Sequence, residues 1–584
     1  MRTKKIVVIA VIAAAFAAWF YFDLGNYLQF ETLQQRIGEL RQWYTEHPLL
    51  AGLAYFIVYI AVTALSVPGA AIMTLAGGAL FGFWYALLLV SFASSIGATL
   101  AFLVSRVLLR DWVQERFGRQ MGAFNAGFER DGSFYLFSLR LVPIFPFFLI
   151  NLLMGLLPIR TWRYYWVSQL GMLPATAVYV NAGTQLGQLE SLSGIISVPL
   201  LGSFVLLAVF PFMARALLNY LQARRVLAGY RRPARFDTNL IVIGAGSAGL
   251  VASLIAATVK AKVTLIERDR MGGDCLNTGC VPSKALIRSA RIAQYARRAR
   301  EFGLAPMTVE VNFPDVMERV QRVVKAIEPH DSVERFTSLG VDCVQGTARI
   351  VSPWEVQVNG RVISARNIVI ASGARPRVPD IPGLQQLDYL TSDTVWEIRQ
   401  LPPRLLVLGA GPIGCELAQA FARLGSQVTL VTHAPRILPR EDADVAEQVQ
   451  DAFQRQGMQV FTGCEPLRFL QDEAGQRCVC GTADGTPELE FDRVLLAVGR
   501  SANVEDMGLE ALDIALTAAG TVAVDDYLRT AVPGIFACGD VAGPYMFTHM
   551  ASHQAWYATV NALFGRFRKF KVDYSVVPLS LIHI

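Results

Sequence analysis

The chain has 584 residues, of which 53% are hydrophobic and only 17% are charged, and its formal net charge is +6. Soluble enzymes carry about a quarter charged residues, so this composition excludes a wholly soluble protein of ordinary type. The length is sufficient for more than one domain. The apolar excess lies before Tyr230, and the rest of the sequence is typical of a soluble α/β protein.

The first apolar run covers residues 6–22 and follows Arg2, Lys4 and Lys5. No small-residue cleavage site comes after it, so it predicts an uncleaved membrane anchor with the N-terminus inside. Further apolar stretches follow at residues 49–65, 70–104, 134–157, 164–180 and 195–218. The stretch at 70–104 is too long for one span and contains four glycines, which favours a re-entrant hairpin followed by a span.

Arginines gather directly after the last apolar stretch, with no acidic residue among them. They are Arg215, Arg224, Arg225, Arg231, Arg232 and Arg235. Basic residues next to a membrane segment mark its cytoplasmic side and attract anionic lipid. Because an apolar stretch directly precedes the cluster, we expect a lipid bilayer and not a nucleic acid as its partner.

One further arginine lies inside an apolar stretch. Arg140 is followed by Pro143, Pro146, Asn151 and Gly155. A charge inside a membrane is costly unless it faces a cavity or a partner. The alternative is an interfacial side chain that extends to the lipid headgroups.

This spacing, together with Pro68-Gly69 and residues 77–82, resembles the DedA-like, SNARE-associated Golgi protein (VTT) family over about residues 45–190. The resemblance implies paired re-entrant loops and, for some members, movement of lipids between leaflets. Some members use membrane-embedded acids, whereas this chain has no Asp or Glu between Glu46 and Asp111. That difference argues against proton-coupled transport.

The soluble half opens on a nucleotide-binding pattern. An apolar run at residues 239–243 leads into Gly244, Gly246 and Gly249 and then into a helical pattern. Such a strand, glycine turn and helix bring backbone N–H groups to a pyrophosphate. A second strand pattern ends in Glu267, at the distance expected for an acid that binds ribose hydroxyls.

All eight cysteines lie from Cys275 onward, and only Cys275 and Cys280 lie in a context that suggests chemistry. Gly279 and Pro282 suit a turn and a helix start, and a helix N-terminus lowers a thiol pKa. The alternative, a structural disulfide, is improbable in a cytoplasmic domain. We interpret the other cysteines as small apolar residues or a strand pair at 478 and 480, and predict no metal site.

Residues 272–284 resemble the redox-active disulfide of the pyridine nucleotide-disulfide oxidoreductases, a family that includes dihydrolipoamide dehydrogenase and mercuric reductase. The likeness covers about residues 237–578. It implies that Cys280 is the flavin-proximal thiol and that Cys275 exchanges with substrate. It also implies that Lys284 lies near the reactive flavin nitrogen and pairs with Glu416. The implied FAD-binding residues are Gly244, Gly246, Gly249, Glu267, Gly273, Ser372, Gly373, Gly539 and Asp540.

The resemblance also implies a nicotinamide nucleotide site. Its residues are Gly409, Gly411, Gly414, Thr432, His433 and Gly499. An acid at the end of the second strand of this site would bind a ribose 2′-hydroxyl and repel a 2′-phosphate. Thr432 occupies that position, and His433 and Arg436 follow it, which favours NADPH while leaving NADH open.

We therefore predict a polytopic α-helical membrane domain followed by an α/β flavoprotein with two dinucleotide-binding domains. The predicted segments are a membrane anchor (1–30), a VTT-like domain (31–223), a basic linker (224–236), the FAD domain (237–375 and 496–568), the NAD(P) domain (376–495) and an interface-domain stub (569–584). Family members usually continue with a dimerisation domain that carries a catalytic histidine. We expect a truncated sequence end here and a homodimer in a full-length form, and we expect His549 and His553 to have packing or cofactor-adjacent roles.

The predicted function is a membrane-tethered oxidoreductase that passes electrons from NAD(P)H through FAD to Cys275 and Cys280 and on to a thiol or disulfide acceptor. Three alternatives stay open: a lipid or small-molecule transporter with the flavin half as a redox sensor, a quinone reductase and an Hg(II) reductase. We expect a multi-pass inner-membrane protein with an even number of crossings. Its catalytic half should face the cytoplasm, where NAD(P)H and reducing conditions are found.

Overall fold

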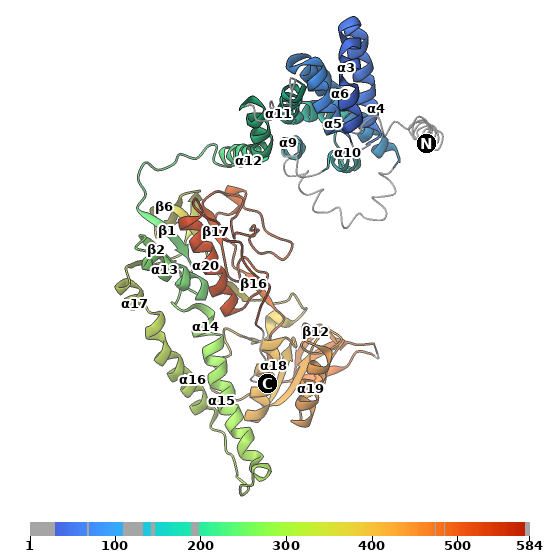
Figure 1. The fold of residues 1–584 in the computed structure, drawn as a ribbon. Coiled ribbons are helices and arrows are strands. Elements are labelled where there is room, and N and C mark those ends of the chain that lie inside the picture. The colour runs from blue at the N-terminus through green and yellow to red at the C-terminus, as the bar shows by residue number, and fades with distance from the viewer. Residues whose placement is uncertain are drawn as a thin grey trace. The chain divides into compact units, whose positions relative to one another are not determined.

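The structure is a computed structural model that describes residues 30–66, 69–108, 132–141, 146–187, 198–473, 475–483 and 485–578. The predicted anchor up to residue 29, Pro68 and Pro143 lie outside the described residues. The chain divides into two compact units, Met1–Arg224 and Arg225–Ile584. Figure 1 shows helices in the first unit, and strands with covering helices in the second.

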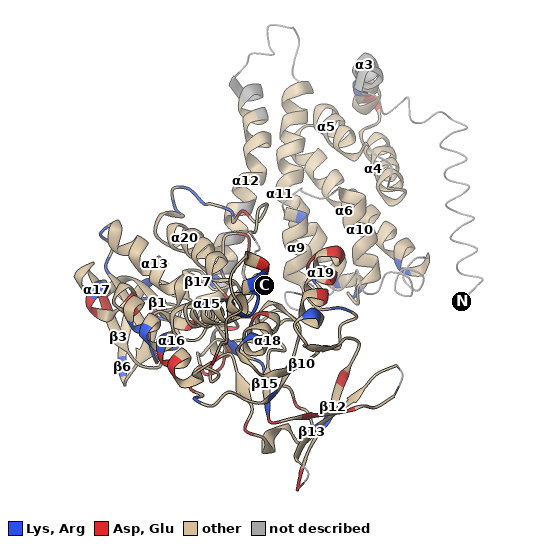
Figure 2. Cartoon of the chain, turned by 90° about the horizontal axis from the view of Figure 1, so that it is seen from below, with Lys and Arg blue, Asp and Glu red and all other residues tan. Residues whose placement is uncertain are grey.

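The first unit is helical over the parts that the structure describes. Its helices are α3 (Phe30–Glu46), α4 (Pro48–Ala64), α5 (Ala70–Phe81), α6 (Phe83–Leu108), α9 (Ser133–Leu141), α10 (Phe147–Leu156), α11 (Thr161–Gly187) and α12 (Val198–Val226). Figure 2 shows that charged residues are sparse on α4, α5, α6, α10 and α11. Helices of this composition bury or present apolar side chains on every face.

Small residues let these helices pack closely. Helix α11 contacts α5, α6 and α9, and α10 contacts α6. At Gly183 a Cβ would lie 2.1 Å from the Leu75 carbonyl oxygen, and at Gly155 it would lie 2.7 Å from Ser105 Cβ. Close approach at glycine is the usual way for apolar helices to gain packing contacts in a membrane.

The long apolar stretch at residues 70–104 is divided at Gly82, which has a φ of +72°, into the short helix α5 and the 26-residue helix α6. By length and composition, α6 is the single helix among the described residues that is able to cross a membrane. Shorter apolar helices accompany it at Pro48–Ala64, Ala70–Phe81, Phe147–Leu156 and Val205–Leu218. Several crossings therefore stay a prediction.

The second unit begins with a mixed sheet whose parallel strands carry the first glycine turn. Its strands are β1 (Thr238–Ile243), β2 (Val263–Glu267), β3 (Val341–Gln345), β4 (Arg349–Ser352), β5 (Glu355–Val358), β6 (Arg361–Ile370) and β17 (Ile535–Ala537). Their order is β3-β2-β1-β6-β5-β4, and β17 pairs with β6 in parallel. The chain therefore returns to this sheet after completing a second one.

The second sheet is parallel and has the order β11-β10-β9-β15-β8. Its strands are β8 (Leu390–Thr391), β9 (Arg404–Leu408), β10 (Gln427–Val431), β11 (Gln459–Phe461) and β15 (Arg493–Leu496). The unit also contains two separate antiparallel groups: β12 (Glu465–Asp472), β13 (Gly475–Gly481) and β14 (Glu488–Phe491), and the pair β7 (Ala374–Pro376) and β16 (Arg500–Ala502).

Helices cover both sheets and position the site. The α-helices are α13 (Ser247–Thr258), α14 (Gly273–Asn277), α15 (Cys280–Arg297), α16 (Phe313–Ile327), α17 (Val333–Ser338), α18 (Pro412–Leu424), α19 (Ala443–Arg455) and α20 (Thr548–Phe564). The 3-10 helices are η2 (Ala299–Phe302), η3 (Glu328–Asp331), η4 (Leu384–Gln386) and η5 (Glu510–Leu512). Helix α13 packs on α20, and α15 packs on α16 and α18. Since α13 and α18 each follow the carboxyl end of a parallel strand, both helix N-termini open where such folds bind nucleotides.

Candidate functional site

The first glycine turn joins β1 to α13. Gly244 has a φ of +101°, a conformation that favours glycine. A Cβ at Gly249 would lie 1.7 Å from the Gly244 carbonyl oxygen, so no larger residue fits there. Gly246 caps α13 without a side-chain hydrogen bond, which leaves the backbone N–H groups of the first helical turn available to a phosphate.

Glu267 ends β2 and lies at this turn. One of its carboxylate oxygens accepts a hydrogen bond from Ala245 N at 2.6 Å, and the other accepts from Asp269 N at 2.9 Å. The backbone of the first glycine turn therefore holds the predicted ribose-binding acid in place.

The cysteine-bearing segment packs against the same turn. Gly272 N donates to the Ala245 carbonyl at 3.0 Å, and a Cβ at Gly273 would lie 2.5 Å from Gly246 Cα. Only glycine permits so close an approach of two backbones. The redox segment and the first dinucleotide turn are therefore one structural unit, although they lie about 30 residues apart in the sequence.

Cys275 lies on the short helix α14, and Cys280 is the first residue of α15; both are free thiols. The two thiols interact and shift each other's pKa. The interaction with Cys275 lowers the pKa of Cys280 to about 6, with smaller contributions from Thr548 and Lys284, while burial opposes the shift. The interaction with Cys280 raises the pKa of Cys275, and burial adds to this shift. Cys280 is therefore the more acidic of the two thiols.

Thr548 completes this centre and was not found from the sequence. It begins α20, and its Oγ1 lies 3.3 Å from Cys280 Sγ. A hydroxyl donor stabilises a thiolate in this position. A lone threonine 268 residues after the cysteine carries no local signal, so only the fold brings the two together.

Lys284 and Glu416 form the ion pair expected from the sequence. Lys284 Nζ donates to Glu416 Oε2 at 2.7 Å, across the packed helices α15 and α18. The Glu416 side chain is 12% exposed and that of Lys284 is 40% exposed. Since Lys284 lies one turn after Cys280 on the same helix, its positive charge also favours the Cys280 thiolate.

Two further turns approach the first sheet from later parts of the chain. Ser372 Oγ donates to the Asn503 carbonyl at 2.7 Å, and Asn503 N donates to the Gly373 carbonyl at 3.0 Å. Gly539 N donates to Oε1 of the fully buried Gln554 at 2.7 Å. Asn503 and Gln554 fix these turns, and no local pattern in the sequence indicated either residue.

Asp540 follows the second of these turns and is mostly buried. Burial raises the pKa of its carboxyl, and the nearby guanidinium of Arg500, at 3.5 Å, opposes this effect. Arg500 also forms an ion pair with Asp274, the residue before Cys275. One arginine therefore connects Asp540, an implied FAD-binding residue, with the redox segment, a link that the sequence did not indicate.

The second glycine turn, between β9 and α18, repeats the first. Gly409 has a φ of +99°, and a Cβ at Gly414 would lie 1.9 Å from the Gly409 carbonyl oxygen. A Cβ at Gly411 would meet nothing within 4 Å. This open backbone at a helix N-terminus fits a second dinucleotide.

The residues after β10 are not equally available to a ligand. Thr432 is buried and accepts a hydrogen bond from Ala434 N at 3.2 Å, whereas His433 is exposed. Arg436 donates to the carbonyls of Pro439 and Glu441, so its guanidinium is held within the loop. Gly499, with a φ of +112°, accepts a hydrogen bond from Arg377 N at 3.0 Å.

Most of the remaining cysteines are buried, and two histidines contact neighbouring protein groups. Cys415, Cys464 and Cys538 are buried, and Cys343 is half-buried. Cys478 and Cys480 lie side by side on β13, with 3.7 Å between their sulfur atoms. His549 stacks on Phe547, and the His553 ring bonds to the Asp573 carbonyl. Within the described part of the chain, no group of histidine, cysteine and acidic residues is placed to hold a metal ion.

In the first unit Arg140 is buried, being 5% exposed, and does not extend to the surface of that unit. Its guanidinium donates to Ser168 Oγ at 3.2 Å, Asn151 Oδ1 at 2.6 Å and Tyr164 Oη at 2.5 Å, and it lies 5.2 Å from the Phe147 ring. Pro146 caps α10, the helix that carries Asn151 and Gly155. Each of these partners is neutral, so the positive charge of Arg140 is not cancelled within the described residues.

Comparisons with known proteins agree with this geometry. The family model for pyridine nucleotide-disulphide oxidoreductases matches residues 238–555, and the model for the VTT domain matches residues 67–185. The chain is 34% identical over 341 residues to the mercuric reductase of Lysinibacillus sphaericus, covering 58% of this chain and 62% of that protein. It is 35% identical over 347 residues to the dihydrolipoyl dehydrogenase of Chlamydia pneumoniae, covering 59% of this chain and 73% of that enzyme.

A solved structure of the HOCl-induced flavoprotein disulfide reductase RclA from Escherichia coli is also similar. It superimposes with a TM-score of 0.51 at 27% identity, over 57% of this chain and 72% of that one. The chain spans between 54% and 62% of the length of the mercuric reductases from Lysinibacillus sphaericus and Bacillus cereus.

Proposed function

Since the chain belongs to the pyridine nucleotide-disulphide oxidoreductases, we propose that it is a membrane-tethered flavoenzyme that uses NAD(P)H and FAD to keep Cys275 and Cys280 reduced. The observation that carries the proposal is the pair of free thiols, Cys275 and Cys280, on a segment packed against the first dinucleotide turn. Members of this family use FAD and NAD(P)H.

Bound FAD would supply two-electron transfer from NAD(P)H to the disulfide of the cysteine pair. The first glycine turn, Glu267, and the turns at Ser372-Gly373 and Gly539-Asp540 are the groups that fit the flavin nucleotide. The second glycine turn fits the nicotinamide nucleotide, because the space next to Gly411 is open.

The protein residues then move protons and exchange bonds. In the reduced pair Cys280 is the thiolate and Cys275 is protonated, as their opposite pKa shifts favour. Transfer of that proton to Cys280 frees the Cys275 thiolate, which attacks one sulfur of an acceptor disulfide, forms a mixed disulfide and expels the first thiolate. The Cys280 proton passes to this thiolate, which leaves as a thiol. Cys280 then attacks Cys275 Sγ, which re-forms the Cys275–Cys280 disulfide and expels the second thiolate, and this thiolate takes a proton from water. Two cysteine thiols are oxidised and one acceptor disulfide is reduced.

Absorbance spectroscopy tests this proposal. The purified full chain should contain FAD, and anaerobic addition of two electrons should produce a long-wavelength band from the Cys280 thiolate beside the oxidised flavin. Cys280→Ser should abolish the band, and Cys275→Ser should retain it without any reductant. Absence of FAD, or a band that survives Cys280→Ser, would remove the proposal.

The acceptor is proposed to be a disulfide or thiol carrier, because thiol exchange needs only the groups that the site contains. Similarity to mercuric reductases makes Hg(II) a second candidate acceptor, and a quinone is a third. A Cys275→Ser variant that reduces quinone at the wild-type rate would favour the quinone over disulfide exchange. The nicotinamide is proposed to be NADPH over NADH, because Thr432, and not an acid, follows β10.

We further propose that the protein is a multi-pass protein of the inner membrane and that its catalytic half faces the cytoplasm. The VTT match, the apolar helix α6 and the arginines that follow the last apolar stretch support this topology. A homodimer is proposed from the family alone. Protease treatment of vesicles of both orientations tests the topology, and cleavage of residues 236–584 from outside intact cells would overturn it.

A second candidate function concerns the first unit, and Arg140 favours it. A buried guanidinium whose partners among the described residues are all neutral is suited to bind an anionic group, such as the phosphate of a lipid in transit. We propose leaflet exchange of anionic lipid as the activity of this unit, with the flavin half acting as a redox sensor. Full-length protein in liposomes should exchange a labelled anionic lipid, and an Arg140→Met variant that exchanges it equally fast would exclude this role.

A further inference from the structure

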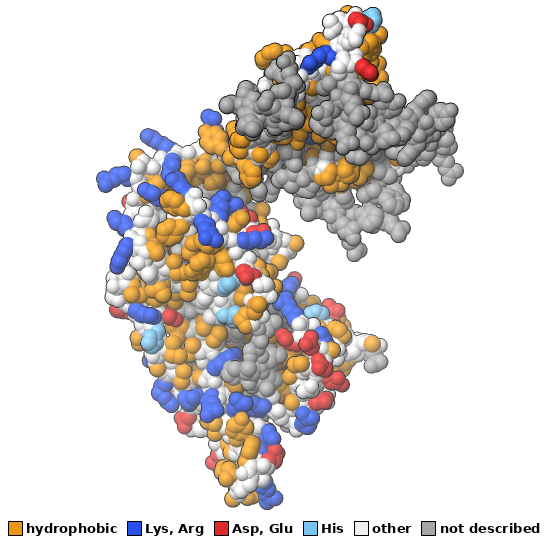
Figure 3. Space-filling view, in the orientation of Figure 1, with side chains coloured by type: hydrophobic (Ala, Val, Ile, Leu, Met, Phe, Trp, Pro, Cys, Tyr) orange, Lys and Arg blue, Asp and Glu red, His pale blue; other side chains and the backbone are white. Residues whose placement is uncertain are grey.

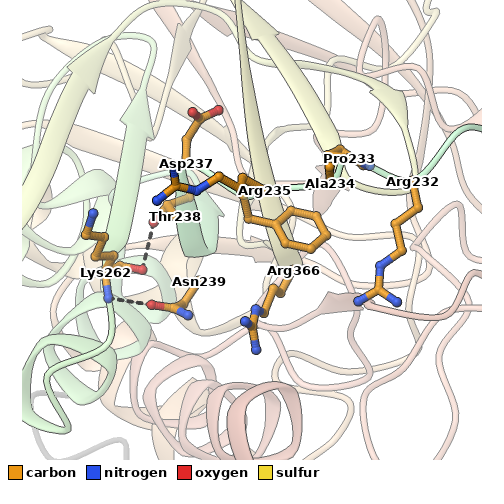
Figure 4. Close-up of a pocket in the computed structure, with 10 residues that line it drawn as sticks. Arg232, Pro233, Ala234, Arg235, Asp237, Thr238, Asn239, Lys262 and Arg366 are labelled. Atoms are coloured by element: carbon orange, nitrogen blue, oxygen red, sulfur yellow. Dashed lines mark hydrogen bonds between the residues drawn. The ribbon is translucent and has the colours of Figure 1, made fainter.

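A basic cavity of about 390 Å³ lies where the second unit begins, away from both glycine turns. Its walls come from residues 232–239, from Lys262 before β2 and from Arg366 on β6 (Figure 4). Strands β1, β2 and β6 are parallel, so these residues share the amino end of the sheet. The first glycine turn follows the carboxyl end of β1, about 20 Å away along a strand of six residues.

The cavity has an excess of positive charge. Arg232, Arg235, Lys262 and Arg366 line it, and none of them makes an ion pair among the described residues. Asp237 is the one acid in the lining, and its carboxylate accepts hydrogen bonds from Ser364 N at 2.9 Å and Ser364 Oγ at 2.8 Å. In Figure 4 that carboxylate points to the opposite side from Arg232 and Arg366. Figure 3 shows basic side chains gathered over this end of the unit, with few acidic ones among them.

Local contacts hold this lining in place. Val226 and Tyr230 pack against the core of the second unit, and Tyr230 Oη donates to the Ala511 carbonyl at 2.9 Å. The Arg232 guanidinium lies 5.6 Å from the Phe236 ring, a favourable cation–π distance. Lys262 N donates to Asn239 Oδ1 at 2.9 Å. The basic groups are therefore presented by an ordered segment and not by a free linker.

The chemistry of this lining selects a phosphate group. Guanidinium groups bind phosphate oxygens in pairs, and Lys262 and Asn239 offer further donors. The position of the cavity in the chain, shortly after helix α12, also indicates the source of the phosphate. Helix α12 contains residues 198–218 of the last apolar stretch and ends at Val226, and Arg232 follows it by six residues, which span at most about 20 Å. A cavity so close in the chain to a membrane segment lies within reach of lipid headgroups.

We propose that this cavity binds the phosphate of an anionic phospholipid and so docks the flavin unit on the membrane surface. Only the lipid source rests on the membrane tether proposed above; the basic cavity itself does not. The cytoplasmic leaflet is negatively charged and attracts basic segments next to membrane spans. The bound lipid fixes the orientation of the flavin unit, which a linker alone would leave free.

Hydrogen exchange of the full chain in lipid nanodiscs tests the proposal. Amide exchange in residues 231–239 should be slower in nanodiscs that mix phosphatidylglycerol with phosphatidylcholine than in nanodiscs of phosphatidylcholine alone. Arg235→Gln combined with Arg366→Gln should remove the difference. Since each basic residue near an anionic surface contributes about fivefold, loss of two should weaken lipid binding about thirtyfold. High salt should weaken the protection as well.

The matched control is Arg322→Gln with Lys325→Gln, which removes two exposed basic residues from α16. This control should keep the protection. Equal exchange in both lipids, protection that survives the cavity variant, or protection lost equally in the control would overturn the proposal. Protection by inorganic phosphate in phosphatidylcholine nanodiscs, without further protection by phosphatidylglycerol, would assign the cavity to a free anion and overturn the lipid source. FAD content and NAD(P)H oxidation, measured on the same samples, report separately on the proposed enzyme function.

Discussion

Thr548 Oγ1 lies 3.3 Å from Cys280 Sγ, which places a hydroxyl donor from α20 on the thiol at the start of α15. This bond lowers the pKa of Cys280, which is about 6. The thiolate is therefore present above about pH 6 and is lost as the pH falls through that value.

We predict that Thr548→Val raises the pKa of Cys280 by about one unit, because the thiolate loses one hydrogen bond. The pH dependence of the long-wavelength thiolate–flavin band, recorded on two-electron-reduced protein, measures this pKa. Thr548→Ser keeps the hydroxyl and should keep the wild-type midpoint. A wild-type midpoint in Thr548→Val would show that the contact has no effect on the thiolate.

The ion pair of Lys284 and Glu416 should tune the same thiolate in opposite directions. Lys284→Gln removes a positive charge that favours the thiolate, so the pKa of Cys280 should rise. Glu416→Gln leaves Lys284 uncompensated, so that pKa should fall. Lys284 is 40% exposed, so solvent screens both effects to about half a unit. If Lys284→Gln and Glu416→Gln shifted the pKa of Cys280 in the same direction, this account would be contradicted.

At the second glycine turn, one substitution tests nucleotide binding and a second substitution tests the stability of the fold. At Gly411 the backbone suits alanine and a Cβ meets no protein atom, so Gly411→Ala should leave the melting temperature unchanged. The added methyl group should nevertheless weaken NAD(P)H binding, because the dinucleotide fills that space. The KM for NAD(P)H and the melting curve measure the two effects.

Gly414→Ala is the matched comparison. Its Cβ would lie 1.9 Å from the Gly409 carbonyl oxygen, so the turn itself must shift at a cost of about 3 kcal/mol. The melting temperature, followed by the release of FAD fluorescence, should fall by roughly 5 °C or more. If Gly411→Ala lowered the melting temperature and left KM unchanged, the nucleotide assignment of this turn would be wrong.

In the first unit, Arg140→Met should destabilise the helical fold by about 3 kcal/mol, because Asn151 and Tyr164 lose a buried charged partner. Heating followed by size-exclusion chromatography of the detergent-solubilised chain measures the loss. Arg163→Met, at an exposed position two residues after the start of α11, is the control and should behave as wild type. Equal heat stability of the two variants would show that the Arg140 network does not support the fold.

Local patterns predicted the parts of the site that one segment builds by itself. The two glycine turns, and the cysteine pair at the start of a helix, follow from spacing within about ten residues. The Lys284–Glu416 pair was also expected, but only through the family resemblance. Thr548 and the ion pair of Arg500 with the cysteine segment were missed, because each residue is brought there by a different element, α20 and β16 respectively. Contacts across hundreds of residues depend on sheet order, which local periodicity does not encode.

The sequence also did not show which side chains are free to bind a ligand and which are already bonded within the protein. Arg436 was expected to be able to receive a 2′-phosphate, but in the structure its guanidinium bonds to two carbonyls of its own loop. Arg140 could have extended to the headgroups, but neutral partners from α10 and α11 surround it. The type of a residue shows which groups its side chain is able to bind, whereas the fold determines which of those groups contact it.

Differential alkylation tests the central claim most directly. The full chain, oxidised and then incubated without oxygen with NADPH or NADH, is treated with a thiol-specific alkylating reagent and digested for mass spectrometry. The account predicts that nicotinamide-dependent labelling appears at Cys275 and Cys280 alone among the eight cysteines, and that it disappears when FAD is removed. Labelling of this pair that is independent of both nucleotides, or nicotinamide-dependent labelling at other cysteines instead, would contradict it.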